Sequence, residues 1–336
     1  MLNGLLLALV VLSLISVRHS ALPLQVLEST GAMPAHLSGS FEIAACHLAP
    51  GGDYLVFDRR SHGVHRVTRA GEPRAIVQIG IEEGRILSPL AFDSAPDGTF
   101  VIADSPTGVD RVQVFFHMGG TVGGFTLPGP SVPRVALGDL VLSGIGSLDY
   151  TGKTVLISQP NSGALISEYS LDGRMLRTFG ELRTTGHEED RDLHLALNAG
   201  IPLALPGGEG FYFVFLGGVP MFRKYDAAGT LVFERHIEGV EIDRHIQSLP
   251  NRWPRRRTPA GEFPIVPPTV RTAAIDPGGR LWVSLASPHT YVYDTGGDKI
   301  RAVQFRSAGI MTPSDFFFAP DGRLLVAPGC YTFNWR

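Results

Sequence analysis

The chain has 336 residues, of which 44% are apolar and 18% charged, and its formal net charge is −3. This length fits one large domain built from repeats, and the apolar content excludes wholesale disorder. The small net charge offers no electrostatic case for a nucleic-acid partner. The 40 glycines and 25 prolines argue against a helical bundle and favour many short strands joined by turns.

The first informative segment is an uncharged apolar run at residues 4–16. It is short for a membrane span and has the length of a signal-peptide core. No Lys or Arg precedes the run and Arg18 follows it, so residues 1–21 are interpreted as a signal peptide cleaved near Ala21 or as an uncleaved membrane anchor. A buried strand or helix is the remaining alternative. Both favoured interpretations make residues 22–336 an exported domain, periplasmic or extracellular, with membrane attachment through residues 4–16 in the second.

A turn rich in Pro, Asp and Gly, followed by a short apolar strand, recurs along the rest of the chain. Glycine supplies the positive φ that such turns need, and proline fixes φ. The turns lie at Pro50–Gly52, Pro96–Gly98, Tyr150–Gly152, Pro206–Gly208, Asp276–Gly279 and Pro320–Gly322. A second turn follows each of the first five, which predicts four half-buried antiparallel strands in each unit.

Four strands in a unit of roughly 40–50 residues are typical of a β-propeller blade. The sequence therefore predicts an all-β fold, a six-bladed β-propeller of four-stranded antiparallel blades. The blades are expected at about 40–80, 88–127, 140–180, 195–237, 269–306 and 313–336. The last blade lacks a fourth strand, and we expect residues 22–29 to supply it, since this closes the ring and removes exposed edges.

The second unit carries the most specific pattern. It contains Pro89, a Pro96-Asp97-Gly98 turn, Val101, Asp104, the run Arg111–Phe115 and then Gly119 or Gly120. This pattern resembles the NHL repeat, whereas the other units keep the turn and strands but lose the Asp and Arg pair. The resemblance implies a propeller. NHL-type propellers mostly bind peptides, proteins, nucleic acids or glycans and do not share one chemistry.

The two cysteines, Cys46 and Cys330, are expected to be free and mostly buried. One face of the propeller carries the first turn of every blade, and we call it the first-turn face. Cys46 lies four residues before Pro50, near this face, whereas Cys330 follows the second strand of the last blade at the opposite face. Several residues of strand height would separate them, and a disulfide needs Cα atoms within about 7 Å.

The longest connector, residues 238–270 between the fourth and fifth blades, is the favoured contact surface. It contains five arginines and a tryptophan with no acid between Arg244 and Glu262: Arg244, Arg252, Trp253, Arg255, Arg256 and Arg257. Arginine suits capture of carboxylate or phosphate, and tryptophan suits stacking. The alternative is a solvated, mobile loop.

The preceding connector carries two histidines and four acids between His187 and His194. Its spacing matches no defined metal motif, so a solvated acidic loop is favoured over a metal site. It is also expected to pair with the basic connector beside it.

A weaker resemblance, to gluconolactonase-type propellers, implies one divalent cation at the channel mouth. The residues that it selects are Glu42, Asn198 and Asp315, which suit Ca²⁺ or Zn²⁺. The motifs depart from that family, because Glu42 is followed by Ile43-Ala44-Ala45 and the acid of Pro313-Ser314-Asp315 is displaced by one residue. Arg271 would also place a like charge near the cation.

We therefore predict an exported NHL-like propeller that is a binding or scaffold module for a protein, peptide or glycan partner, without a cofactor. The alternative is a metal-dependent hydrolase or lactonase. No Gly-x-Ser-x-Gly elbow and no phosphate-binding loop is present in the sequence.

Overall fold

The computed structural model describes residues 22–33, 40–128, 136–137, 140–141, 145, 147–259 and 261–336. The expected export or anchor segment, residues 1–21, lies outside the described residues. Among those described, no helix is long and apolar enough to cross a membrane.

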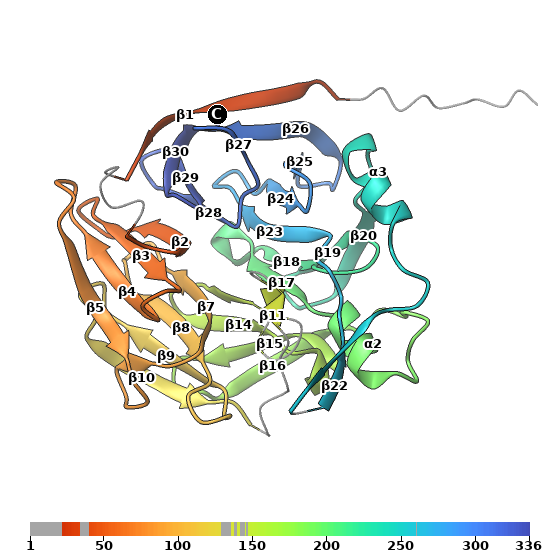
Figure 1. Cartoon of the computed structure of the whole chain (residues 1–336), viewed down its shortest axis with the longest axis horizontal. Helices are drawn as coiled ribbons and strands as arrows, with labels where there is room; N and C mark the ends of the chain where they lie inside the picture. Colours follow the sequence, from red (N-terminus) through yellow and green to blue (C-terminus); the bar gives the residue numbers. More distant parts are fainter. Residues whose placement is uncertain are drawn as a thin grey trace, which may run out of the picture.

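Antiparallel four-stranded sheets follow one another along the chain and are arranged around a common centre (Figure 1). The first sheet contains β2 (Ile43–Leu48), β3 (Tyr54–Asp58), β4 (Gly63–Val67) and β5 (Pro73–Ile79), with the short β6 (Arg85–Ile86) parallel to β5. The next contains β7 (Pro89–Ser94), β8 (Phe100–Asp104), β9 (Arg111–Phe115) and β10 (Thr121–Thr126). A separate ladder then joins β11 (Ala136–Leu137) and β12 (Leu140–Val141).

The following sheet is formed by β13 (Leu148–Tyr150), β14 (Thr154–Ser158), β15 (Ala164–Ser170) and β16 (Met175–Glu181). After it come β17 (Gly200–Ala204), β18 (Gly210–Phe215), β19 (Met221–Asp226) and β20 (Leu231–His236). The next set is β23 (Val270–Ile275), β24 (Leu281–Leu285), β25 (Thr290–Tyr293) and β26 (Lys299–Arg306), with β27 (Ile310–Met311) pairing with β26. The four-stranded antiparallel sheets that the repeat predicts are confirmed.

The N-terminal strand completes the last sheet, as predicted. That sheet contains β28 (Asp315–Phe318), β29 (Arg323–Ala327) and β30 (Tyr331–Asn334), and β1 (Leu24–Ala32) is antiparallel to β30. β1 is also parallel to β26, from Leu24 opposite Ala302 to Glu28 opposite Arg306, so it joins two neighbouring sheets. Figure 1 shows β1 running along the outside of β26 and β30.

The turns and the core follow from the repeat. Gly98 in the Pro96-Asp97-Gly98 turn has a φ of +81°, and a Cβ there would collide with the ring of Pro50 in the first sheet. The second strands, such as β3 and β8, are buried along their whole length. They are apolar on both faces because a neighbouring sheet packs against each side.

Both long connectors contain regular secondary structure. α2 (Arg191–Leu197) lies in the acidic connector, and Asp190 accepts from the backbone N–H of Leu193 as its N-cap. The basic connector forms α3 (Val240–Gln247) and a hairpin of β21 (Arg255–Thr258) and β22 (Gly261–Pro264). Two single turns of 3₁₀ helix, η1 (Pro160–Ser162) and η2 (Pro206–Gly208), occupy turns between strands.

Candidate functional site

A central cavity of about 1060 Å³ is lined by the first strand of each sheet: β2, β7, β13, β17, β23 and β28. Side chains alternate along a strand, so every second residue of these strands faces the centre. The acidic, basic and imidazole side chains of these strands that line the cavity are those of His47, Asp93, Asp149, Arg271 and Asp315. The cavity extends to the first-turn face, where Pro96, Pro206, Pro277 and Pro320 also line it.

His47 is buried between the first sheet and its two neighbours. Its Nδ1 lies 2.7 Å from Ser94 Oγ and its Nε2 lies 3.4 Å from Asp315 Oδ2. The ring stacks on Phe317, with centroids 4.5 Å apart. Burial by itself lowers the pKa of His47, but the carboxylates of Asp315 and Asp93 outweigh it, and the pKa of His47 is raised above its usual value.

Asp93 and Asp149 face the cavity from adjacent inner strands. Asp93 accepts from the backbone N–H of Tyr150 at 2.6 Å, and Asp149 accepts from that of Ala204 at 3.1 Å. Burial raises the pKa of Asp93 to about 6, opposed in part by His47. Burial and the charge of Asp93 raise the pKa of Asp149 well above its usual value. The cavity therefore holds acid and base groups that interact with one another, which is typical of functional sites and also occurs in structural networks.

The three residues selected for a cation do not meet around this cavity. Asp315 lines it, whereas Glu42 and Asn198 are not among the lining residues. Glu42 is exposed, and its backbone N–H donates to Asp58. The Asn198 carboxamide accepts from the Arg183 N–H and donates to the carbonyls of Arg183 and His194. In the part of the chain that the structure describes, no three His, Cys, Asp or Glu side chains gather closely enough to hold a metal ion.

The arginine connector is held against its acidic neighbour. Arg255 Nη1 lies 2.6 Å from Asp190 Oδ2, so the predicted pairing of the two connectors is confirmed. Trp253 and Phe263 pack against the apolar side of α2 and against Val266. Trp253 is therefore half-buried and anchors the hairpin, and it does not stand free as the stacking platform that the sequence suggested.

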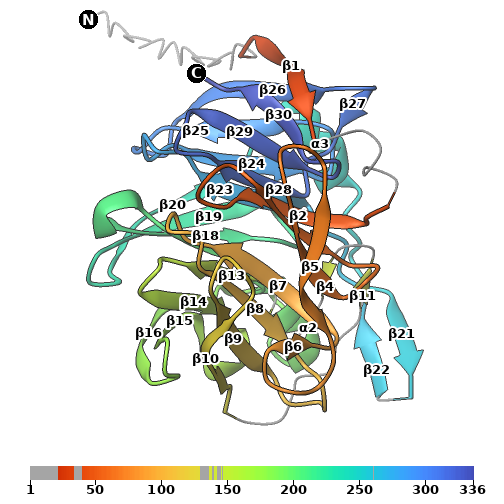
Figure 2. The same ribbon diagram turned by 90° about the vertical axis from the view of Figure 1, so that its left-hand side faces the viewer.

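The remaining arginines are exposed. Arg244 lies on α3, Arg252 precedes the hairpin, and Arg256 and Arg257 lie on β21. The Arg257 side chain is 87% exposed, with Nη2 3.8 Å from Glu262 Oε2. The side chains of Arg252 and Arg256 make no hydrogen bond or ion pair with any described residue. Figure 2 shows the β21–β22 hairpin standing out from the body of the molecule.

The cysteine prediction is half wrong. Both cysteines are buried, at 1% and 0% exposure, but they form a disulfide with their Cα atoms 5.6 Å apart. Cys46 lies in the middle of β2, opposite Val56. Cys330 lies in the turn after β29, whose last residue, Ala327, pairs with Asp315 at the start of β28.

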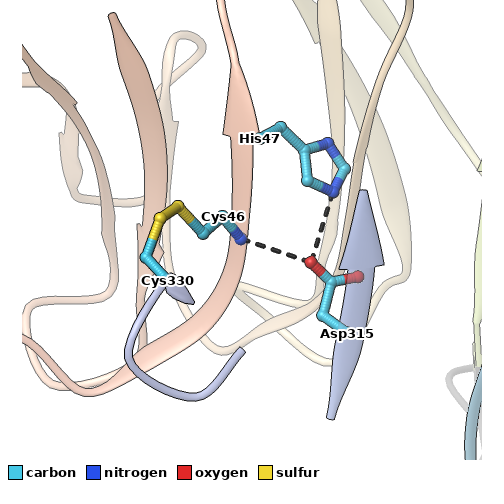
Figure 3. The surroundings of a disulfide bond; sticks show 4 residues. All are labelled: Cys46, His47, Asp315 and Cys330. Atoms are coloured by element: carbon cyan, nitrogen blue, oxygen red, sulfur yellow. Dashed lines mark hydrogen bonds and ion pairs between the residues drawn. A yellow bond between two sulfur atoms is a disulfide. The ribbon is translucent and has the colours of Figure 1, made fainter. Parts of the chain in front are cut away.

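The prediction of free cysteines failed because it placed the first and the last sheet at the wrong height relative to one another. The start of β28 lies beside the middle of β2, because the Asp315 carboxylate accepts from the Cys46 N–H at 3.2 Å. The turn that carries Cys330 is therefore level with Cys46. Figure 3 shows Cys46 and His47 on opposite sides of β2, with dashed lines from the Asp315 carboxylate to the Cys46 nitrogen and to the imidazole.

Sequence reasoning did not identify His47, Asp93 and Asp149 as one group. The available signal was an acid or histidine inside an otherwise apolar first strand of a unit, as in Leu90-Ala91-Phe92-Asp93. Asp315 begins its first strand and was therefore predicted, whereas His47, Asp93 and Asp149 lie further along theirs.

Comparison with known proteins identifies the fold. No protein-family model and no curated protein sequence matches the chain. A solved structure of a streptogramin B lyase matches with a TM-score of 0.51 at 10% identity, over 86% of this chain and 76% of that one. Virginiamycin B lyase from Staphylococcus aureus matches with a TM-score of 0.50 at 12% identity, over 91% of this chain and 97% of that one. At such identities the likeness concerns the fold alone. Together with the arrangement of the sheets, it shows that this chain is a β-propeller.

Proposed function

We propose that the chain is an exported, six-bladed, NHL-like β-propeller that serves as a binding or scaffold module for a protein, peptide or glycan partner. Each four-stranded sheet is one blade in this proposal, and β1 completes the sixth. No cofactor is part of it.

The NHL-like character is supported by the second sheet. Arg111 Nε lies 2.7 Å from Asp104 Oδ1, and its Nη2 lies 3.0 Å from Asp104 Oδ2. The same guanidinium donates to the carbonyls of Ile81 and Arg85 in the preceding connector. The Asp and Arg of the repeat pattern thus form a bidentate pair that ties the sheet to its connector.

Export is supported by two features. The apolar run at residues 4–16 suits a signal peptide or an anchor, and disulfides persist in oxidising compartments such as the periplasm and the extracellular space. A periplasmic or extracellular location therefore fits the chain, with membrane attachment through residues 4–16 if that segment is retained.

The observation that carries the binding proposal is the anchored hairpin. Its base is fixed by Trp253, Phe263 and the Arg255–Asp190 pair, while Arg252, Arg256 and Arg257 are left exposed. A fixed platform loses little conformational freedom when it binds, and guanidinium groups match carboxylates or phosphates of a partner. Of the six residues predicted from the sequence, the proposed contacts with a partner are therefore Arg252, Arg256 and Arg257 together with Arg244 on α3.

The test compares two charge-matched variants. R256S/R257S removes two charges from the hairpin, and R74S/R174S removes two exposed charges from β5 and the turn before β16. Binding to immobilised polyglutamate peptide, dextran sulfate and uncharged dextran is measured at two salt concentrations. The proposal expects salt-sensitive binding of an anionic probe that is lost only in R256S/R257S. Equal binding by both variants would remove the hairpin from the proposal.

A second candidate, a hydrolase acting in the central cavity, is favoured by the His47–Asp315 pair. The predicted cation set does not fit, so this candidate relies on His47 and the cavity carboxyl groups as acid and base. A lactone and ester panel assayed with the chain and with H47Q tests it. Hydrolysis that H47Q abolishes supports this candidate, and the absence of hydrolysis of the panel by the unmodified chain counts against it.

A further inference from the structure

The ring of sheets closes where the last sheet (β1 with β28–β30) packs against the first (β2–β5), and we call this contact the seam. The segment β28–β30 is joined to β1, which also pairs with β26, at three positions among the described residues: Ser29–Phe333, Gly31–Thr332 and Ala32–Tyr331. A register shift interrupts this short ladder between Ser29 and Gly31. Segments held by few ladder pairs open locally at lower free energy than the rest of a fold.

The disulfide crosses this seam. Cys330 belongs to the last sheet and Cys46 to the first, 284 residues away in sequence. The Cys330 carbonyl also accepts from the backbone N–H of Met33, directly after β1. Side chains of both sheets, among them Val56, Leu325 and Ala327, pack around the two sulfur atoms in one apolar cluster.

The covalent bond and the cavity share one segment of β2. The N–H of Cys46 donates to Asp315, and the next residue, His47, faces the same carboxylate from the cavity side (Figure 3). The distance between β2 and β28 therefore sets both the disulfide geometry and the His47–Asp315 contact. The other charged group beside His47 is Asp93 on β7, which does not cross the seam.

We propose that the Cys46–Cys330 disulfide is a redox latch on the central cavity: its reduction lets the β28–β30 segment move away from β2 and separates Asp315 from His47. The latch is distinct from the hairpin and does not depend on the binding proposal. It makes the arrangement of the cavity a function of the thiol–disulfide state of the surroundings.

The reducing partner is a dithiol. One of its thiolates attacks one sulfur of the disulfide and forms a mixed disulfide, while the other cysteine leaves as a thiolate and takes up a proton. The second thiol of the reductant then displaces the protein sulfur, which is also protonated. Two electrons pass to the protein, and the dithiol becomes a disulfide. Both cysteines are buried, so this attack requires the seam to open first.

The first test is amide hydrogen exchange in the oxidised chain, the dithiothreitol-reduced chain and a C46A/C330A variant. A disulfide that acts only through the unfolded chain changes exchange by global unfolding by the same factor everywhere. The latch instead predicts that amides of β2, β28 and β30 speed up at least about tenfold more than those of β18 and β19. The same factor in both groups, or no change in either, would overturn the proposal.

The second test follows the His47 ring by NMR in the folded state. Asp315 contributes to the raised pKa of His47, so reduction is expected to lower that pKa. Oxidised D315N is the reference for the titration alone, because it removes the Asp315 charge and should lower the pKa of His47 while the disulfide stays intact. An unchanged His47 titration after complete reduction would contradict the latch even if the C46A/C330A variant failed to fold.

Discussion

The Asp93 carboxylate accepts a 2.6 Å hydrogen bond from the backbone N–H of Tyr150, which belongs to the inner strand of the next sheet. Asp149 bonds to Ala204 in the same way, and Asp315 bonds to Cys46 across the seam. Each of these three side chains accepts from the backbone of the neighbouring inner strand, so together they join inner strands around the cavity. The acid groups of the cavity thus have a role in holding the ring together, whatever the cavity binds.

The first prediction concerns the dependence of stability on pH. A carboxyl whose pKa is raised by folding contributes stability that is present below its unfolded pKa and lost as the pH rises through its folded pKa. Asp93, raised from 3.8 to about 6, should therefore make the fold more stable at pH 5 than at pH 7.5. The raised pKa values of Asp149 and His47 act in the same direction.

The measurement is the free energy of unfolding in urea at the two pH values. D93N should reduce the difference by about 1 to 2 kcal/mol, since one pKa unit corresponds to about 1.4 kcal/mol and pH 5 lies about one unit below the folded pKa. D298N, at an exposed turn, serves as the control and should leave the difference unchanged. A D93N chain with the same pH dependence as the parent would show that Asp93 does not carry the effect.

The second prediction concerns the disulfide and global stability. Cross-linking residues 284 positions apart removes much conformational freedom from the unfolded chain, about 5 kcal/mol in the chain-entropy description. C46A/C330A should lower the unfolding free energy by an amount of this order, with a smaller added contribution from lost packing. Dithiothreitol should destabilise the parent to a similar extent and leave the variant unchanged. Equal stability of the oxidised parent and the variant would exclude this contribution.

The third prediction compares two arginine–aspartate pairs. The Asp104 side chain is fully buried beside Arg111, whereas the Arg323 and Asp321 side chains are 34% and 50% exposed. R111A leaves a buried carboxylate without its cation and should cost about 3 to 5 kcal/mol. R323A should cost less than about 1 kcal/mol. Chemical unfolding of both variants checks the contrast, and similar losses would show that burial does not govern the pair.

The fourth prediction concerns the anchor of the hairpin. W253A removes the indole that packs against α2, so the β21–β22 hairpin should detach while the ring of sheets stays folded. Cleavage by trypsin after Arg255, Arg256 or Arg257 should then become faster, with the main thermal transition nearly unchanged. N251A, at an exposed neighbouring position, is the control. Equal cleavage of W253A and N251A would show that Trp253 does not hold the hairpin.

Local patterns predicted most of the fold. The Pro-Asp-Gly turns and alternating strands act over a few residues, so the positions of the four-stranded sheets follow from the sequence alone. The missing fourth strand of the last unit, together with the strand-like residues after residue 21, was enough to place β1. Its second, parallel contact with β26 depends on how two sheets lie side by side and leaves no trace in the local pattern.

The candidate site was less predictable. Opposite charge and proximity in sequence correctly indicated that the two connectors pair, and Asp190 does contact Arg255. The role of Trp253 was misjudged because an exposed and a packed tryptophan look the same in a sequence. The cavity group was missed because His47, Asp93 and Asp149 come from three sheets, and only ring closure brings them together.

By itself, the sequence determined that each unit is a four-stranded antiparallel sheet and where its turns lie. It also determined that β1 completes the last sheet and that both cysteines are buried. These properties depend on backbone geometry and apolar patterning within one unit. Only the tertiary structure decided that Cys46 and Cys330 are bonded and that His47, Asp93 and Asp149, from three different sheets, face one cavity. Both depend on the relative height of neighbouring sheets, which is set by side-chain packing between units and is not encoded by any local period.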